Sequence, residues 1–384
     1  MIPTREAALE RLNEFLPRAG AAYARDRNFD HGPDDRSNIS MLSPYLRHRL
    51  ITEEEVTLAV LTEHGARRAE KFLQEVAWRT YWKGWLEMRP GLWNAFLDAL
   101  PELPRNEAYQ QAVTGRSGLD CFDAWARELN ETGYLHNHTR MWFASIWIFT
   151  LKLPWQLGAE FFMRHLMDAD PASNTLSWRW VAGLHTPGKH YLARASNITK
   201  FTGGRFNPAG ELNESATPLP PDGEFERQPL TLEPDPATGE KRVGHLLTPD
   251  DLSSAPGELG PVSSRAVIGE ASDHSGEAAR RFLVGALKDV ADRSEARLLE
   301  GDPAQAIRSW IDDEKLDLVV VSQPTVGPWH ELTAHPNLPI QFFTRNWDRT
   351  LWPKATAGFF KLKKSLPLLH EAMQSRTQSL RSPL

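Results

Sequence analysis

Residues 132–206 hold the stretch that decides the fold: TGYLHNHTRMW (132–142), PWQLGAEFFMRHLMDADPASNTLSWRW (154–180) and GKHYLARASNITKFTGGRF (188–206). The spacing of their apolar residues predicts three linked helices. Tryptophans stand beside carboxylates, amides and an arginine, among them Asp168, Asp170, Asn174 and Arg140. An ordinary core has little use for this mixture, because each buried polar group needs a partner. The stretch therefore predicts a site for a large planar ligand with polar edges.

Composition narrows the class of protein. The chain has 384 residues, a net charge of −6 and a single cysteine, Cys121. This length allows two domains, and the mildly acidic charge means that DNA binding would need a local basic patch. One cysteine excludes an intrachain disulfide and favours a reducing compartment, and no Cys/His spacing for a metal surrounds it. Without a signal-peptide pattern or a long apolar run, we expect a soluble cytoplasmic protein with no membrane span.

Tryptophan and proline divide the chain. Most of the 14 tryptophans lie between Trp78 and Trp180, whereas residues 208–261 contain none and are rich in proline. Proline fixes φ and lacks an N–H donor, so this segment is predicted to be an extended connector, with one short hairpin around DPATGEKR (235–242). We therefore expect one domain over 1–207, a linker over 208–261 and a second domain over 262–384.

The first domain shows helical periodicity and no alternation typical of strands. Thr52 and Glu55 form the pattern of a capping box at the start of a helix over 53–65. The other helices expected from the apolar spacing are at 67–89, 119–129, 138–151, 157–167 and 173–183.

The second domain alternates between strand and helix patterns. Short apolar runs at 265–269, 317–321 and 338–343 are typical of parallel strands, and helical stretches adjoin them at 276–292 and 303–314. This order predicts a small parallel sheet with right-handed crossovers. The segment GEASDHSG (269–276) occupies a ligand-loop position but lacks a glycine-rich phosphate fingerprint, so an ordinary turn is favoured there.

Several motifs together resemble the flavin-binding domain of the photolyase/cryptochrome family. The most specific is DADPASN (168–174), which is similar to that family's Asp-Gly-Asp-x-x-x-Asn, followed by HNHTRM (136–141) and EVAWR (75–79). In the family a small α/β domain precedes the helical one. The resemblance therefore implies a circularly permuted or rearranged member, with an all-α flavin-binding domain followed by a small parallel α/β antenna-like domain and a C-terminal helix. The tail from Pro324 to Lys361 looks like the last strands of such an antenna domain.

FAD is the cofactor that the resemblance implies, with the antenna chromophore left open. The family's diphosphate cradle is matched by Tyr23 and by ISMLSPYL (39–46), although Ile39 and Met41 replace a threonine and an arginine. Arg140 and Asp168 are expected to form a buried ion pair, because either charge buried alone would cost several kcal/mol. The full set carried over for FAD is Tyr23, Ser40, Met41, Leu42, Ser43, Arg79, Asn137, Arg140, Asp168, Asp170 and Asn174.

Two tryptophans match the first members of the family's electron relay. They are Trp178 and Trp155, and Asn174 matches the amide that faces flavin N5. These three residues are the expected catalytic set. The third relay tryptophan has no clear counterpart, and Trp125, Trp93 and Trp147 remain candidates.

Four further residues match the family's lesion pocket. Trp78 and Trp180 correspond to the walls that hold a cyclobutane pyrimidine dimer, Met141 to its floor and Glu75 to the carboxylate that accepts hydrogen bonds from a base. From spacing alone, Glu75 and Arg79 could instead form a surface ion pair, four residues apart on one helix. His138 replaces an arginine that touches DNA phosphate in many relatives, and its loss would lower affinity.

Three hypotheses for function follow. The first is a DNA photolyase, a carbon–carbon lyase that splits pyrimidine dimers in DNA by electron transfer from light-excited FADH⁻. The second is a cryptochrome-like photoreceptor that binds FAD and repairs nothing. The third is a helical domain without flavin, which a flavin absorption band near 450 nm would exclude.

Overall fold

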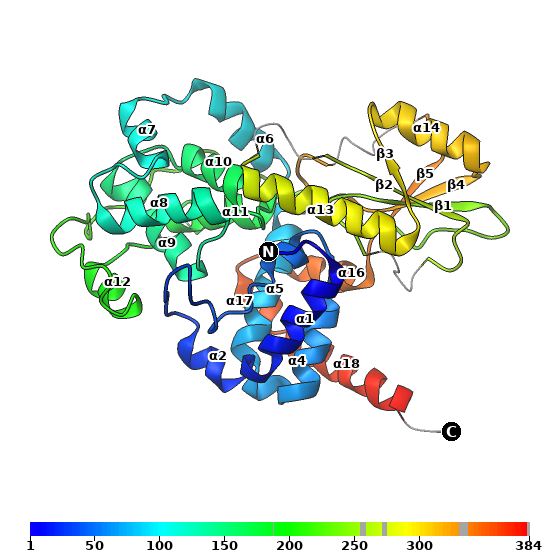
Figure 1. Cartoon of the computed structure of the whole chain (residues 1–384), viewed down its shortest axis with the longest axis horizontal. Helices are drawn as coiled ribbons and strands as arrows, with labels where there is room; N and C mark the ends of the chain where they lie inside the picture. Colours follow the sequence, from blue (N-terminus) through cyan, green and yellow to red (C-terminus); the bar gives the residue numbers. More distant parts are fainter. Residues whose placement is uncertain (187, 254–258, 271–274, 330–336, 382–384) are drawn as a thin grey trace.

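Helices fill the first half of the chain. The structure is a computed structural model that describes residues 1–186, 188–253, 259–270, 275–329 and 337–381. The helices of the first half are α1 (Arg5–Phe15), α2 (Ala21–Asp26), α3 (Ser43–Arg47), α4 (Glu53–Arg68), α5 (Glu70–Glu87), α6 (Gly91–Ala99), α7 (Glu107–Val113), α8 (Asp120–Thr132), α9 (Asn137–Ser145), α10 (Trp155–His165), α11 (Pro171–Ala182) and α12 (Ala195–Phe201). They form the helical body on the left and at the bottom of Figure 1.

Local sequence signals set several helix ends. The capping box at the start of α4 is confirmed, because Thr52 accepts a hydrogen bond from the backbone N–H of Glu55 and the Glu55 carboxylate accepts one in return. Helix α11 starts where Asp170 accepts from the N–H of Ser173, and it ends at Gly183 in the left-handed conformation. The helix expected over 138–151 is interrupted: α9 ends at Ser145 and continues as a π-helical turn, η3 (Ile146–Thr150).

Five parallel strands form the sheet of the second half. They are β1 (Val243–Leu247), β2 (Ser264–Ile268), β3 (Arg297–Leu299), β4 (Leu318–Ser322) and β5 (Ile340–Phe343), in the order β3-β2-β1-β4-β5. Helices α13 (Glu277–Ser294) and α14 (Pro303–Glu314) are the crossovers. The structure thus combines a helical part in the first half of the chain with a parallel α/β part in the second half. Residues 271–274 of the predicted turn after β2 and residues 330–336 of the tail lie outside the described residues.

The connector differs from its prediction. Its residues 243–247 form β1, the central strand, so the interpretation of the whole segment as a linker was wrong there. The predicted hairpin is absent from this described segment, because only a turn precedes β1, whose partners β2 and β4 are both parallel. The strand was not predicted because it is only five residues long and lies between proline-rich segments. The earlier part of the connector binds the helical body through Leu219 N–H to the Ala182 carbonyl (3.1 Å) and Gln228 N–H to the Met88 carbonyl (2.8 Å).

The C-terminal helices return to the helical body. Helices α16 (Asn346–Leu351), α17 (Phe359–Lys363) and α18 (Leu366–Arg381) pack on α4 and α5, and Figure 1 shows the orange and red helices among the blue ones. Trp347 Nε1 donates to Thr80 Oγ1 at 2.9 Å, and Gly84 leaves room for Trp352. Residues assigned from sequence to the antenna-like domain thus complete the core of the helical body.

Buried ion pairs join the sheet to the helical body. Arg47 contacts Asp250 at 2.8 Å and Arg49 contacts Asp251 at 3.5 Å, and all four side chains are at most 6% exposed. Asp250 follows β1 at the strand-order reversal, where parallel sheets usually bind ligands. It also accepts from the Thr325 N–H at 3.2 Å, so the chain's own polar groups converge at this edge.

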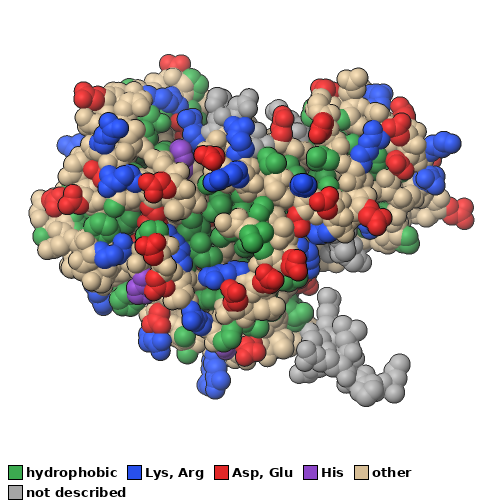
Figure 2. All heavy atoms as spheres, in the orientation of Figure 1, with side chains coloured by type: hydrophobic (Ala, Val, Ile, Leu, Met, Phe, Trp, Pro, Cys, Tyr) green, Lys and Arg blue, Asp and Glu red, His purple; other side chains and the backbone are tan. Residues whose placement is uncertain are grey.

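The surface has no face of one charge sign in the view of Figure 2. Acidic and basic side chains are interspersed there, and hydrophobic side chains gather near the middle. No helix within the described ranges combines the length and apolar character needed to cross a bilayer.

Candidate functional site

A cavity of about 460 Å³ lies in the helical body between α2, α3, α5, α9 and α11. Its size is typical of sites for small molecules and cofactors. The predicted site residues that line it are Tyr23, Ser40, Met41, Leu42, Ser43, Glu75, Trp78, Arg79, Asn137, Arg140, Met141, Asp168, Asp170, Asn174, Trp178 and Trp180. Trp155 is the predicted site residue that does not line it. Residues that lie as far apart in the sequence as Tyr23 and Trp180 thus line one cavity.

Arg140 and Asp168 form the expected ion pair. The guanidinium donates twice, to Asp168 Oδ1 and Oδ2, at 2.9 Å each. Burial alone raises the pKa of the Asp168 carboxyl, but Arg140 outweighs burial and holds that pKa below its ordinary value. Asp168 is 2% exposed, whereas Arg140 is 23% exposed toward the cavity. A fixed positive charge is therefore presented to any ligand.

Asp170 is surrounded by three cations. Its Oδ2 lies 3.4 Å from Lys83 Nζ, 3.7 Å from Arg79 Nη1 and 3.9 Å from Arg47 Nε. Burial raises the pKa of Asp170, but these charges lower it further than burial raises it, so the carboxyl stays ionised. The net positive charge of this cluster suits a ligand that carries phosphate or an anionic ring.

Asn174 presents a neutral acceptor. Its Nδ2 donates to the Ala159 carbonyl at 2.8 Å, which leaves Oδ1 available at the cavity. An amide oxygen can accept from a ring N–H without placing a negative charge beside the ring.

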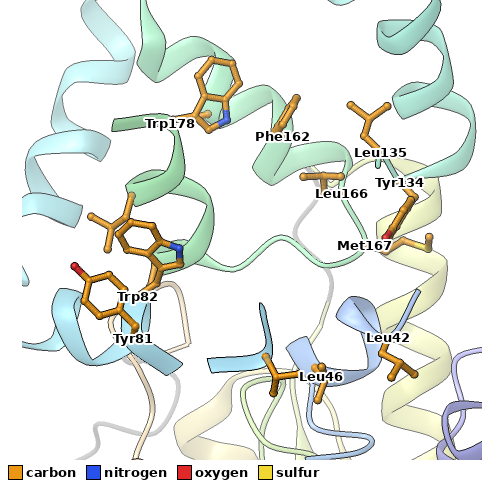
Figure 3. Close-up of a cluster of buried hydrophobic side chains, with 14 of the residues drawn as sticks. Leu42, Leu46, Tyr81, Trp82, Tyr134, Leu135, Phe162, Leu166, Met167 and Trp178 are labelled. Atoms are coloured by element: carbon orange, nitrogen blue, oxygen red, sulfur yellow. The ribbon is translucent and has the colours of Figure 1, made fainter. Parts of the chain in front are cut away.

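Aromatic and aliphatic side chains form the apolar walls. Trp178 packs against Phe162 with ring centroids 5.1 Å apart and an interplanar angle of 81°. Figure 3 shows Trp178, Phe162 and Leu166 on one side and Leu42 and Leu46 on the other. An apolar interior with a few charged groups at its rim matches a large ring system with polar edges.

The residues predicted to bind the diphosphate lie at the N-terminal end of α3. Ser40 and Ser43 line the cavity, and Met41 between them has φ +57°, a left-handed conformation that is rare for a non-glycine residue. Such strained residues cluster at ligand sites. Arg79 Nη2 donates to the Ser43 carbonyl at 3.4 Å, which ties the cradle to α5.

Glu75 does not pair with Arg79. Its carboxylate binds Arg27, the residue that follows α2, at 2.5 Å, while Arg79 lies beside Asp170, so the alternative of a surface ion pair within α5 was wrong. Burial raises the pKa of Glu75 above its ordinary value. His138 Nδ1 donates to the Asn28 carbonyl (3.0 Å) and is buried, so it is not a surface group.

The two tryptophans of the predicted lesion pocket have different surroundings. Trp78 is covered on one face by Phe359 of α17, with ring centroids 3.9 Å apart and planes within 11° of parallel. Trp180 is stacked on Tyr191 at 5.8 Å. Both indoles are half-buried and still line the cavity.

Sequence reasoning missed Lys83, Arg47, Arg27 and Phe359. Lys83 follows Arg79 by four residues on α5, so its buried face could have been read from the periodicity. Arg27, Arg47 and Phe359 come from distant segments, and no local pattern connects them to the site.

The predicted relay residues are not all adjacent. Trp155 is buried and packs on Phe96 with ring centroids 5.8 Å apart, and Trp93 packs on Phe96 at 5.3 Å. Trp147 contacts Trp178 directly at 6.1 Å, whereas Trp125 stacks on Trp142 at 5.6 Å. These contacts do not assign the third tryptophan of the relay.

Buried polar atoms without hydrogen-bond partners test the fit of a cofactor. Four of those found among the described residues belong to the cavity lining: Arg79 Nη1, Asp170 Oδ2, Ser173 Oγ and Trp178 Nε1. The first two form an ion pair at 3.7 Å, so Ser173 Oγ and Trp178 Nε1 are the groups left for a ligand to satisfy, since buried polar groups are rarely left unpaired. The residues present fit FAD, whose phosphates, ribityl hydroxyls and ring edges supply such groups.

Comparison with known proteins agrees with this geometry. Residues 72–215 match the family model of the FAD binding domain of DNA photolyase. This helical body is thus an FAD-binding domain, and FAD is its cofactor. Over residues 72–215 the chain is thus similar to the FAD-binding domain of the photolyase/cryptochrome family.

Individual relatives match about half of the chain. The chain is 28% identical over 219 residues to the deoxyribodipyrimidine photo-lyase of Vibrio cholerae, covering 54% of this chain and 45% of that protein. It is 34% identical over 188 residues to that of Agrobacterium fabrum, covering 47% and 38%. A crystal structure of a bacterial class III photolyase from Agrobacterium tumefaciens aligns with a TM-score of 0.45 and 29% identity, covering 52% and 43%. The chain spans less than half the length of these relatives.

Proposed function

We propose that this chain is a light-dependent DNA photolyase that splits cyclobutane pyrimidine dimers. The observation that carries the proposal is the shared cavity: Glu75, Trp78, Met141 and Trp180 line the same space as the residues assigned to FAD. A dimer held by the first group would lie against the cofactor held by the second. The related proteins named deoxyribodipyrimidine photo-lyase support this assignment.

The residues proposed to bind FAD fall into charged and neutral groups with different roles. Arg140, Arg79 and Lys83 supply positive charge for an anionic reduced ring and the phosphates, and Ser40 and Ser43 supply hydroxyl donors at the cradle. Asn174 accepts at the ring without opposing its charge. When bound and reduced, FAD supplies an electron donor that light can excite.

The lesion pocket is proposed to use stacking and one carboxylate. Trp180 and the uncovered part of Trp78 provide flat apolar surfaces, and Glu75 provides acceptors for base N–H groups. Burial raises the pKa of Glu75, and Arg27 offsets only part of that rise while its ion pair holds the carboxylate in place. DNA that contains a pyrimidine dimer is therefore the proposed substrate and partner.

A blue-light photoreceptor without repair activity is the second candidate. Phe359 favours it, because this ring already stacks on Trp78 in the place where a flat ligand could bind. Buried His138 favours it as well, since it offers no charge to a DNA phosphate. This candidate shares FAD and light absorption with the first and differs in having no affinity for the lesion.

The domain order is proposed to be a rearrangement of the family's usual one. Here the helical FAD-binding body comes first in sequence and the parallel sheet follows, while the last helices return to α4 and α5. The sheet is the proposed counterpart of the antenna domain.

Trp180→Ala tests the lesion pocket. Stacking of a base on an aromatic ring is worth roughly 1–3 kcal/mol, so binding of dimer-containing DNA should weaken by about ten-fold or more. Binding of undamaged DNA should hardly change, because phosphate contacts dominate it and Trp180 is uncharged. Fluorescence anisotropy with matched damaged and undamaged oligonucleotides measures both.

Two controls make that result specific. Trp310→Phe alters a buried tryptophan of α14 far from the cavity and should change neither affinity. FAD content of the Trp180 variant should equal that of the wild type. Equal affinity of wild type and Trp180→Ala for the damaged strand would favour the photoreceptor instead.

A further inference from the structure

We propose that electrons reach the cofactor site through Trp178, Trp147 and Tyr109, a branch that leaves Trp155 aside and ends on a tyrosine. The proposal rests on the proposed function only in requiring bound FAD, and it holds for a photolyase and for a photoreceptor alike. Its two links are ring contacts within the helical body.

The first link is the contact between Trp178 and Trp147. Their ring centroids lie 6.1 Å apart at an interplanar angle of 85°. Gly158 of α10 makes this approach possible: a Cβ there would lie 2.2 Å from Trp178 Cη2 and 3.0 Å from Trp147 Cε2. Both indoles are at most 2% exposed, so the pair is shielded from water.

The second link joins Trp147 to Tyr109. These ring centroids lie 6.0 Å apart at 87°. Tyr109 belongs to α7, where Arg105 and Asn106 before it and Gln110 after it are exposed, so the ring lies just beneath the surface. Trp147 Nε1 donates to the Pro154 carbonyl at 2.9 Å, which fixes its indole between the two partners.

Ring contacts separate this branch from Trp155. Trp147 contacts Trp178 directly, with ring centroids 6.1 Å apart, whereas Trp155 packs on Phe96 at 5.8 Å.

The electron balance of the branch is simple. With FAD bound, Trp178 would give one electron to the light-excited oxidised ring, Trp147 would then give one to Trp178, and Tyr109 would give one to Trp147. Tyr109 releases its phenolic proton to surface water and becomes a neutral radical. An external thiol then returns one hydrogen atom to Tyr109 and becomes a thiyl radical, two of which combine to a disulfide. Loss of the proton slows the return of the electron.

The test uses the full FAD-loaded chain without DNA, under blue light with a thiol. Electron paramagnetic resonance should detect a tyrosyl radical in the wild type and none in Tyr109→Phe or Trp147→Phe. Photoreduction should slow by about ten-fold or more in Trp147→Phe, equivalent to 1.4 kcal/mol per decade. Tyr81→Phe, which removes a hydroxyl 3.1 Å from His185 Nε2, is the matched control and should retain the signal.

Two outcomes would overturn the branch. One is a tyrosyl signal that persists in Tyr109→Phe; the other is normal photoreduction in Trp147→Phe together with its loss in Trp155→Phe. A separate readout needs no flavin: the Trp178 and Trp147 indoles should contribute to the far-ultraviolet exciton signal of the flavin-free protein, and Trp147→Phe should reduce that signal. An unchanged signal in Trp147→Phe contradicts the first link even if the chain binds no FAD.

Discussion

Replacing Arg140 with alanine should give protein that is poorly soluble or carries little FAD. The change leaves the Asp168 carboxylate buried, 2% exposed, without the guanidinium that donates two hydrogen bonds to it. Stranding one member of a buried ion pair costs about 3–5 kcal/mol. Asp168→Ala should fail for the converse reason, because it strands the Arg140 charge beside the cavity. The ratio of flavin to protein absorbance in purified protein measures the effect.

The controls for this prediction are a surface pair and a conservative change. Arg25→Ala removes the partner of Asp26 where Arg25 is 74% exposed, and it should leave FAD content unchanged. Arg140→Lys keeps the charge but not the two-pronged geometry, so it should retain an intermediate amount of FAD. Normal flavin content in both Arg140→Ala and Asp168→Ala would refute the assignment of this pair to the cofactor site.

Replacing Trp178 with phenylalanine should abolish photoreduction of bound FAD. Phenylalanine fills most of the space between Phe162 and Trp147 but is much harder to oxidise. FAD binding should survive, because the apolar wall is largely kept. The change in flavin absorbance under blue light with a reductant measures the rate.

Trp310→Phe is the matched control here too, since it removes an equally buried indole outside the helical body. It should leave photoreduction unchanged. Undiminished photoreduction in Trp178→Phe would show that electrons enter by a route that avoids this indole.

Local patterns predicted the helical elements well. The capping box at Thr52 and Glu55 and the start of α11 at Asp170 depend on residues three positions apart, so they are visible in the sequence. The π-helical turn after Ser145 was missed, because apolar residues all round this helix leave no face to set its register. Strand β1 was missed for a different reason: five residues among prolines carry too little signal.

Contacts between side chains far apart in the sequence could not be predicted from local patterns. The motif at 168–174 predicted that Asp168 would meet Arg140, but it did not indicate that Lys83 and Arg47 would surround Asp170. Glu75 was expected near Arg79 or a base, and Arg27 was found instead. Phe359 reaches Trp78 only because the C-terminal helices fold back on α5. Such contacts depend on tertiary packing and leave no periodicity.

The most direct test of the proposed function is light-driven repair of a defined lesion. The wild-type chain, loaded with FAD and reduced, is mixed with an oligonucleotide that contains one cyclobutane thymine dimer, and half of the sample is kept dark. We expect blue light to restore the two thymines, seen as recovered absorbance near 260 nm and as a new chromatographic peak, and we expect no change in the dark sample. Intact dimer after illumination of FAD-loaded, photoreducible protein would contradict the account and leave the photoreceptor as the better candidate.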